Sequence, residues 1–170
     1  MILGMSVPAF TAFHVALSLI GLLSGVIVLL GLLNGKSLPG WTALFLVTTI
    51  ATSATGFLFQ SPSVDPARIV GVISLIVLAG AVAALYIYHL RGAWRSVYIS
   101  TAILALYLNA FVGVAQAFQK IPFLHALAPL GSERPFLVAQ SIVLVLFVLA
   151  AVFSLKRFHP IPVAPDPVAR

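Results

Sequence analysis

The sequence predicts an all-α polytopic membrane protein, a helix bundle with about five transmembrane helices. Of its 170 residues, 62% are hydrophobic and only 7% are charged, whereas a soluble domain carries roughly 25% charged residues. So few charges do not cover the surface of a water-soluble domain of this length. The charged residues also divide the chain into uncharged stretches, and each stretch is close to the about 20 residues that cross the hydrocarbon core of a bilayer.

Five uncharged stretches have the length and hydrophobicity of a membrane span. The expected helices cover residues 10–33, 41–60, 69–90, 97–118 and 136–155. Turn-forming pairs such as Asn34-Gly35 and Pro39-Gly40 separate them. No basic residue precedes the first stretch, which is longer than the roughly 7–15 apolar residues of a signal peptide, so we expect a retained span. Residues 1–158 are therefore predicted to form one transmembrane bundle.

The distribution of cations predicts how the bundle is oriented. Five spans place Arg68, Lys120 and Arg134 on the side of the N-terminus. The other side receives six cations, namely Lys36, Arg91, Arg95, Lys156, Arg157 and Arg170. Because cytoplasmic loops carry the excess of Lys and Arg, we expect a bacterial cytoplasmic (inner) membrane protein with a periplasmic N-terminus and a cytoplasmic C-terminus. The proline-rich residues 159–170 are expected to form a cytoplasmic tail, either a docking segment or a solvated end.

The composition argues against several classes of function. The absence of cysteine excludes disulfides, thiolate metal sites and cysteine nucleophiles. The three acidic residues, Asp65, Glu133 and Asp166, lie outside the expected spans, which disfavours two-carboxylate catalysis and coupled ion transport. A net charge of +6 spread over short loops forms no continuous face for nucleic acid. The expected partners are the lipid bilayer and, as a hypothesis, other membrane subunits or further copies of this chain.

The fourth expected helix carries a polar stripe. Residues spaced three or four apart fall on one of its faces: Tyr98, Thr101, Ala105, Asn109, Gly113, Gln116 and Lys120. Asn109 lies in the middle of the span, where an amide that faced lipid would have no hydrogen-bond partner. We therefore expect Asn109 to be buried between helices, either as an interhelical hydrogen bond or as a ligand contact.

The first two expected helices contain patterns that are typical of packing. Thr48, Thr52 and Thr55 follow one face of the second helix, where threonine hydroxyls can donate to carbonyl groups of their own helix. Gly21 and Gly25 form a GxxxG pattern in the first helix, which predicts a close helix crossing.

Polar residues gather in the expected outer half of the bundle. His14, Thr55, Gln60, Gln116, Gln119 and Gln140 should lie at comparable depth beneath the loop 119–135. The apolar stretch 121–130 in that loop is expected to form a short interfacial helix over the mouth of the bundle. The candidate ligand-binding residues are His14, Asn109, Gln116, Gln140 and His125. A pocket there suits a quinone, a lipid or another amphipathic molecule, and a packed lid without a ligand is the alternative.

The four histidines were considered as haem ligands, since histidine is a common axial ligand. His14 is expected near the outer end of the first span and His89 at the inner end of the third, so the two cannot bind one iron. Only the pairs His14 with His125, and His89 with His159, remain. No cofactor is predicted, and quinone or haem is kept as an alternative.

Several motifs carry a resemblance to known proteins. They are His89-Leu-Arg-Gly-Ala-Trp-Arg95, Leu106-Tyr-Leu-Asn-Ala-Phe-Val112 and Thr52-Ser-Ala-Thr-Gly-Phe57. Over roughly residues 10–150 the chain resembles an uncharacterised family of small multi-span bacterial inner-membrane proteins. Residues 60–66 depart from the Phe-Pro-rich turn of that family. The resemblance implies a multi-span fold and brings no activity or site residue with it.

These observations predict a non-catalytic integral membrane protein. It would be either an accessory subunit of a larger membrane assembly or a small bundle that binds an amphipathic ligand. The alternative is a redox-associated membrane protein that binds quinone or haem.

Overall fold

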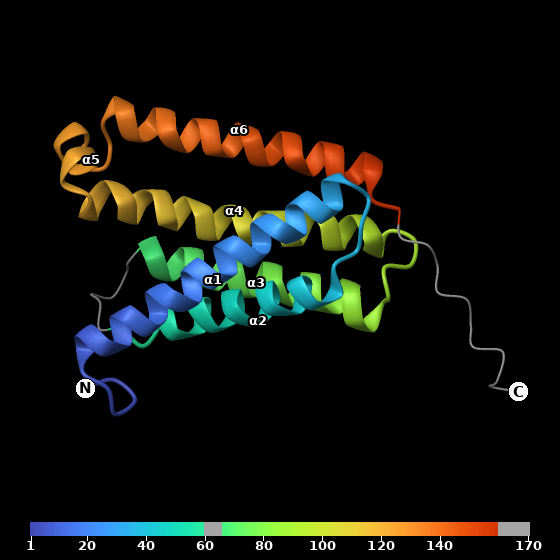
Figure 1. Ribbon diagram of the computed structural model, residues 1–170, viewed down its shortest axis with the longest axis horizontal. Coiled ribbons are helices and arrows are strands. Elements are labelled where there is room, and N and C mark those ends of the chain that lie inside the picture. The colour runs from blue at the N-terminus through green and yellow to red at the C-terminus, as the bar shows by residue number, and fades with distance from the viewer. Residues whose placement is uncertain (60–65, 160–170) are drawn as a thin grey trace, which may run out of the picture.

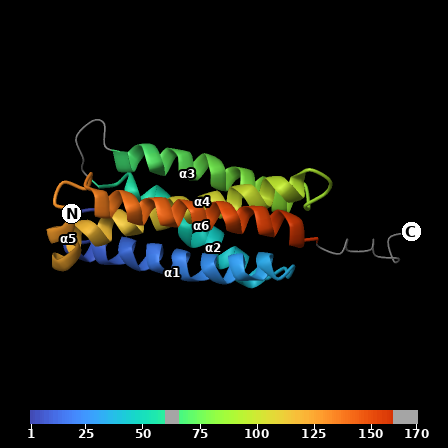
Figure 2. The same cartoon turned by 90° about the horizontal axis from the view of Figure 1, so that it is seen from above.

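The chain folds as a helix bundle in a computed structural model that describes residues 1–59 and 66–159. This part contains six α-helices and one π-helical segment: α1 (Val7–Leu33), α2 (Pro39–Gly56), α3 (Pro66–Val82), η1 (Ala83–Ile87), α4 (Trp94–Lys120), α5 (Pro122–Leu127) and α6 (Arg134–Arg157). The five long helices run along one axis, and α5 lies at one end beside α4 and α6 (Figures 1 and 2). The all-α prediction is confirmed.

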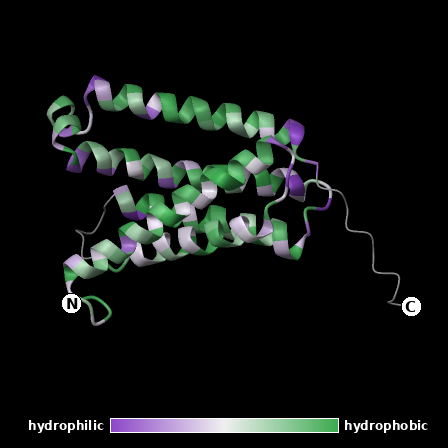
Figure 3. Ribbon diagram, in the orientation of Figure 1, coloured by the Kyte–Doolittle hydropathy of each residue, from purple (hydrophilic) through white to green (hydrophobic). Residues whose placement is uncertain are grey.

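Four helices are long and apolar enough to cross a membrane. They are α1, α4, α6 and the continuous segment Pro66–Ile87 formed by α3 and η1. Apolar residues follow the helix bodies, and hydrophilic residues concentrate at the two ends of the bundle (Figure 3). These features are those of a multi-pass membrane protein in contact with lipid. The expected span 41–60, which corresponds to α2, is not among these four helices. Six hydroxyl residues lower the hydropathy of α2: Thr42, Thr48, Thr49, Thr52, Ser53 and Thr55.

The third expected helix, 69–90, ends earlier than predicted. The α-helical hydrogen bonds stop at Val82, and η1 follows. The N–H of Leu90 then donates to the carbonyl of Ala84 at 3.0 Å, which closes a wider turn than an α-helix allows. His89 and Leu90 have φ angles of 49° and 57°, a left-handed conformation that ends a helix.

Helix α1 is tilted relative to the other long helices, so its two ends have different neighbours. Its N-terminal half lies beside α2, and its C-terminal end reaches the end of α6 (Figure 1). There the Arg157 guanidinium donates to the carbonyl of Leu33 at 3.4 Å. Because α1 crosses the bundle obliquely, α1 and α4 separate toward the N-terminal end of α1 (Figure 1).

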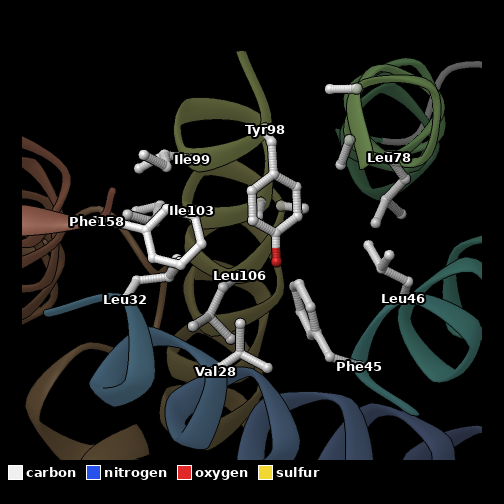
Figure 4. Packing of buried hydrophobic residues seen from close by; sticks show 14 residues of the cluster. Val28, Leu32, Phe45, Leu46, Leu78, Tyr98, Ile99, Ile103, Leu106 and Phe158 are labelled. Atoms are coloured by element: carbon white, nitrogen blue, oxygen red, sulfur yellow. The ribbon is translucent and has the colours of Figure 1, made fainter. Parts of the chain in front are cut away.

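Apolar side chains fill the half of the bundle that contains the C-terminal end of α1. The ring of Tyr98 extends from α4 between Phe45, Leu78 and Phe158, side chains that come from α2, α3 and the residue after α6 (Figure 4). Tyr98 is only 3% exposed, and its hydroxyl lies 3.5 Å from Oγ1 of Thr42. This half of the bundle is therefore a solid core.

Gly25 marks the closest approach of α1 to its neighbours. A Cβ atom added at Gly25 would lie 2.4 Å from Cδ1 of Leu106 and 2.9 Å from the ring of Phe45. Both side chains are buried, so relief of these close contacts requires a shift within the core. At Gly21 an added Cβ would lie 3.0 Å from Oγ1 of Thr49 and 3.3 Å from Nδ2 of Asn109. The prediction of a close crossing at the GxxxG pattern is confirmed.

The start of α6 is organised by an exposed carboxylate. Glu133 precedes α6 and accepts hydrogen bonds from the N–H groups of Leu130 and Ser132 at 2.9 and 3.0 Å. These hydrogen bonds, that of Leu130 first, hold the pKa of the Glu133 carboxyl below its usual range.

The packing at Gly25 makes a testable prediction. Gly25→Ala should lower the free energy of unfolding by about 1–3 kcal/mol, the usual cost of overpacking a filled core. Gly113→Ala is the matched control, because its nearest neighbour, Cδ1 of Leu22, would lie 3.6 Å from the new Cβ. Removing this mid-helix glycine should leave stability unchanged or raise it by about 0.5–1 kcal/mol. Thermal unfolding in a mild detergent compares the two variants, and equal melting temperatures would contradict the prediction.

Candidate functional site

A pocket of about 570 Å³ lies among α1, α2, α3 and α4, where α1 separates from α4. Along α1 it extends from Thr11 to Leu22, a length of about 16 Å at the helical rise of 1.5 Å per residue. Its volume falls within the roughly 300–1,000 Å³ that small-molecule sites occupy. Most of the wall is apolar, and the polar lining residues are Thr11, His14, Ser18, Thr49, Thr52, Ser53, Arg68, Ser74, Asn109, Gln116 and Lys120.

Asn109 connects α4 to α1 at the inner part of this pocket. The hydroxyl of Ser18 donates to Oδ1 of Asn109 at 3.0 Å, and Nδ2 of Asn109 donates to the carbonyl oxygen of Ser18 at 3.3 Å. Asn109 is 7% exposed, so its predicted burial between helices is confirmed. The small residue at Gly21 lets α1 approach this amide. Asn109 thus joins two helices and also lines the pocket.

His14 is held in one orientation by α2. Its Nδ1 lies 2.9 Å from Oγ1 of Thr55, and its ring packs edge-on against Phe59 with the centroids 5.1 Å apart. The single hydroxyl proton of Thr55 is directed to the carbonyl of Ala51 at 2.7 Å. In a neutral His14, donation from Nδ1 to Thr55 satisfies both contacts and leaves the other ring nitrogen, Nε2, as a hydrogen-bond acceptor.

The hydroxyl groups of α2 donate mainly to their own helix. Thr48 donates to the carbonyl of Leu44 at 2.7 Å, and Thr52 donates to the carbonyl of Thr48 at 2.8 Å. With the bond of Thr55, this confirms the predicted pattern. Such hydroxyls offer the pocket an oxygen acceptor rather than a donor. Thr49 is the exception, because its buried Oγ1 has no hydrogen-bond partner in the part of the chain that the structure describes.

Two cations line the open end of the pocket. Arg68 lies in the first turn of α3 and Lys120 is the last residue of α4. One guanidinium nitrogen of Arg68, Nη2, donates to the carbonyl of Phe59 at 3.1 Å, whereas its buried Nε has no partner among residues 1–59 and 66–159. Lys120 is exposed, as is Gln116 one turn before it. Among the described lining residues, Arg68 and Lys120 are the charged ones.

The structure brings together three of the five predicted site residues. His14, Asn109 and Gln116 line the pocket, and Gln140 and His125 do not. Nε2 of Gln140 donates to the carbonyl of Phe111 at 3.0 Å, which places Gln140 between α4 and α6.

The expected cover over the pocket mouth is not observed. Residues 121–130 do contain a short helix, α5, on which His125 is exposed. However, α5 lies beside α4 and α6 and contributes no residue to the pocket (Figure 1). Gln60 and the predicted tail beyond residue 159 lie outside the described residues.

Sequence reasoning missed Ser18, Arg68 and Lys120 as parts of the site. In the sequence, Arg68 indicates only the orientation of the chain, and Lys120 belongs to the polar stripe of the fourth expected helix. A sequence signal for Ser18 did exist, because small and polar residues recur every three or four positions on one face of α1: Thr11, His14, Ser18, Gly21 and Gly25.

Comparison with known proteins identifies no family. No protein-family model matches the chain, and neither a curated protein nor a solved structure matches it. The resemblance to small bacterial inner-membrane proteins therefore stays a hypothesis, and the description that holds is a small multi-span membrane protein.

The Ser18–Asn109 pair predicts an energetic coupling. Asn109→Leu and Ser18→Ala should each lower stability, because each removes a hydrogen bond between α1 and α4. Such bonds contribute about 0.6 kcal/mol on average in membrane proteins and up to about 1.7 kcal/mol. The double variant should lose less stability than the two single losses added together. Unfolding in detergent measures this cycle, and strict additivity would show that the two side chains do not interact.

Proposed function

We propose that the chain is a non-catalytic membrane protein that binds a small amphipathic molecule in the pocket among α1, α2, α3 and α4. The observation that carries the proposal is the combination of a large apolar wall with a few oriented polar groups in one pocket. Ligand sites typically combine these two features. The polar groups belong to four helices: His14 and Ser18 on α1, Thr49 on α2, Arg68 on α3 and Asn109 on α4.

The orientation in the membrane is part of the proposal. We treat α2 as a fifth span, since its 18 residues measure about 27 Å and the three threonines Thr48, Thr52 and Thr55 donate within the helix. Five spans then place the start of α3 and α5 on one side, with fewer cations than the other side. By the positive-inside rule, the N-terminus is periplasmic in a bacterial inner membrane and the end of α6 is cytoplasmic.

One observation favours the redox-associated alternative. The acceptor nitrogen Nε2 of His14 suits a hydroxyl donor, which a reduced quinone carries and an oxidised quinone lacks. Haem binding belongs to the same alternative and would give a Soret band in a reduced-minus-oxidised spectrum.

The accessory-subunit hypothesis depends on a different surface. Gln140 and Ser154 are the buried residues of α6, and most of its apolar side chains face outward. Lipid or another subunit can cover this face. Copurification of one partner in stoichiometric amount would favour the subunit hypothesis.

Filling the pocket should remove the ligand. We expect organic extracts of the purified protein to contain one class of amphipathic molecule above its membrane average. Val112→Trp should abolish this enrichment, because Val112 lines the pocket and the indole would occupy it. Leu146→Trp is the control, since Leu146 is 59% exposed on α6.

Mass spectrometry of the three extracts tests the proposal. The same lipids in equal amounts in all three samples would contradict it. An enriched quinone that Val112→Trp removes would favour the redox-associated alternative.

The orientation is tested with single cysteines, because the chain contains none of its own. Ser37 and Ser132 are exposed and lie in turns at opposite ends of the bundle. In intact spheroplasts an impermeant maleimide should label Ser132→Cys and leave Ser37→Cys unlabelled until the cells are lysed. The reverse pattern would overturn the orientation, and labelling of both sites would overturn the fifth span.

A further inference from the structure

The open end of the pocket differs from its interior in charge. Arg68 and Lys120 lie at this end, and the deeper polar residues Ser18, Thr49 and Asn109 are neutral. The described lining contains no carboxylate to balance the two cations. The buried Nε of Arg68 has lost its hydration, and an anion that accepts its hydrogen bond would restore the lost stabilisation.

Two arginines at the other end of the bundle have carbonyl partners. At the opposite end, Arg95 donates to the carbonyls of Leu155 and Phe158, and Arg157 donates to the carbonyl of Leu33. Carbonyls at helix C-termini are natural acceptors for these guanidinium groups. Within the described residues, the buried Nε of Arg68 has no acceptor, and Lys120 is exposed. Among the described residues, the buried Nε of Arg68 is thus a donor at the pocket that packing leaves without an acceptor.

We propose that the pocket binds an aliphatic chain that ends in an anionic head group, a carboxylate or a phosphate, with the head between Arg68 and Lys120. This inference rests on the proposed function and specifies its ligand class. The chain lies along the apolar wall formed by Val15, Leu19 and Val112. The length of about 16 Å along α1 accommodates an acyl chain of medium length.

His14 lies at the same end of the pocket as the cations, because its ring packs against Phe59, whose carbonyl accepts from Arg68. In a neutral His14, Nε2 is an acceptor, because Nδ1 supplies the proton to Thr55. A carboxylate is also an acceptor, and two acceptors in contact repel each other. The anionic head is therefore excluded from the space next to Nε2 and is attracted to the cations at the mouth.

A binding experiment with matched head groups tests the inference. Tritiated laurate is bound to the full chain in a sterol-based neutral detergent, with unlabelled laurate, dodecyl phosphate and dodecanol as competitors. We expect laurate and dodecyl phosphate to compete at least tenfold better than dodecanol, which has the same chain and no charge. The better of the two anions identifies a carboxylate or a phosphate head.

Two double variants distinguish an effect of Arg68 and Lys120 on laurate binding from an effect of the net charge of the protein. Arg68→Gln combined with Lys120→Gln should weaken laurate binding at least tenfold. Lys36→Gln combined with Lys156→Gln removes the same charge at the opposite end of the bundle and should leave laurate binding unchanged. Thermal unfolding verifies that each variant is folded.

One outcome would contradict the anionic head group alone, and another would contradict the proposed pocket function. If the Arg68 and Lys120 variant keeps the wild-type affinity, or if dodecanol competes as well as laurate, the anionic head group is wrong and the pocket remains a binding site. If laurate and dodecanol bind Val112→Trp as tightly as the wild type, the proposed pocket function itself fails.

Discussion

The close contact of α1 with α2 and α4 at Gly25 is the constraint on which the rest of the bundle depends. Leu106 and Phe45 fill the space that a side chain at this position would need. With α1 fixed there at an oblique angle, its C-terminal end lies against α6 and its N-terminal end lies away from α4. The same crossing thus closes one half of the bundle as a solid core and opens the other half as a pocket.

Hydrogen bonding decides which polar groups stay available to a ligand. In hydrocarbon every polar group needs a partner within the protein, and the threonines of α2 find theirs one turn earlier in their own helix. Ser18 instead donates across the bundle to Asn109. Among the described lining residues, the buried hydroxyl of Thr49 and the buried Nε of Arg68 are left without a partner.

The sequence predicted the helix bodies well, because uncharged stretches of membrane length and periodic small or polar residues are local signals. It also predicted the burial of Asn109, since an amide in the middle of a span has no partner in lipid. The lid expected from residues 121–130 was wrong, because nothing in the sequence shows that α1 is tilted away from α5. Gln140 was misplaced for the same reason: its depth could be counted along the helix, but its bond to Phe111 depends on how α6 packs on α4.

The arrangement of donors and acceptors restricts the ligand more than the volume of the pocket does. Any medium-length chain fits the apolar wall, so the wall alone selects weakly between ligands. The acceptor Nε2 of His14 rejects an anion and accepts a hydroxyl, whereas the cations at the mouth attract an anion. A quinol and an acyl chain with a charged head therefore require different groups of the same pocket. Arg68 and Lys120 are the only cations of the described lining, so their contribution to the binding affinity distinguishes these ligands. The chain with an anionic head group is the ligand that uses both cations.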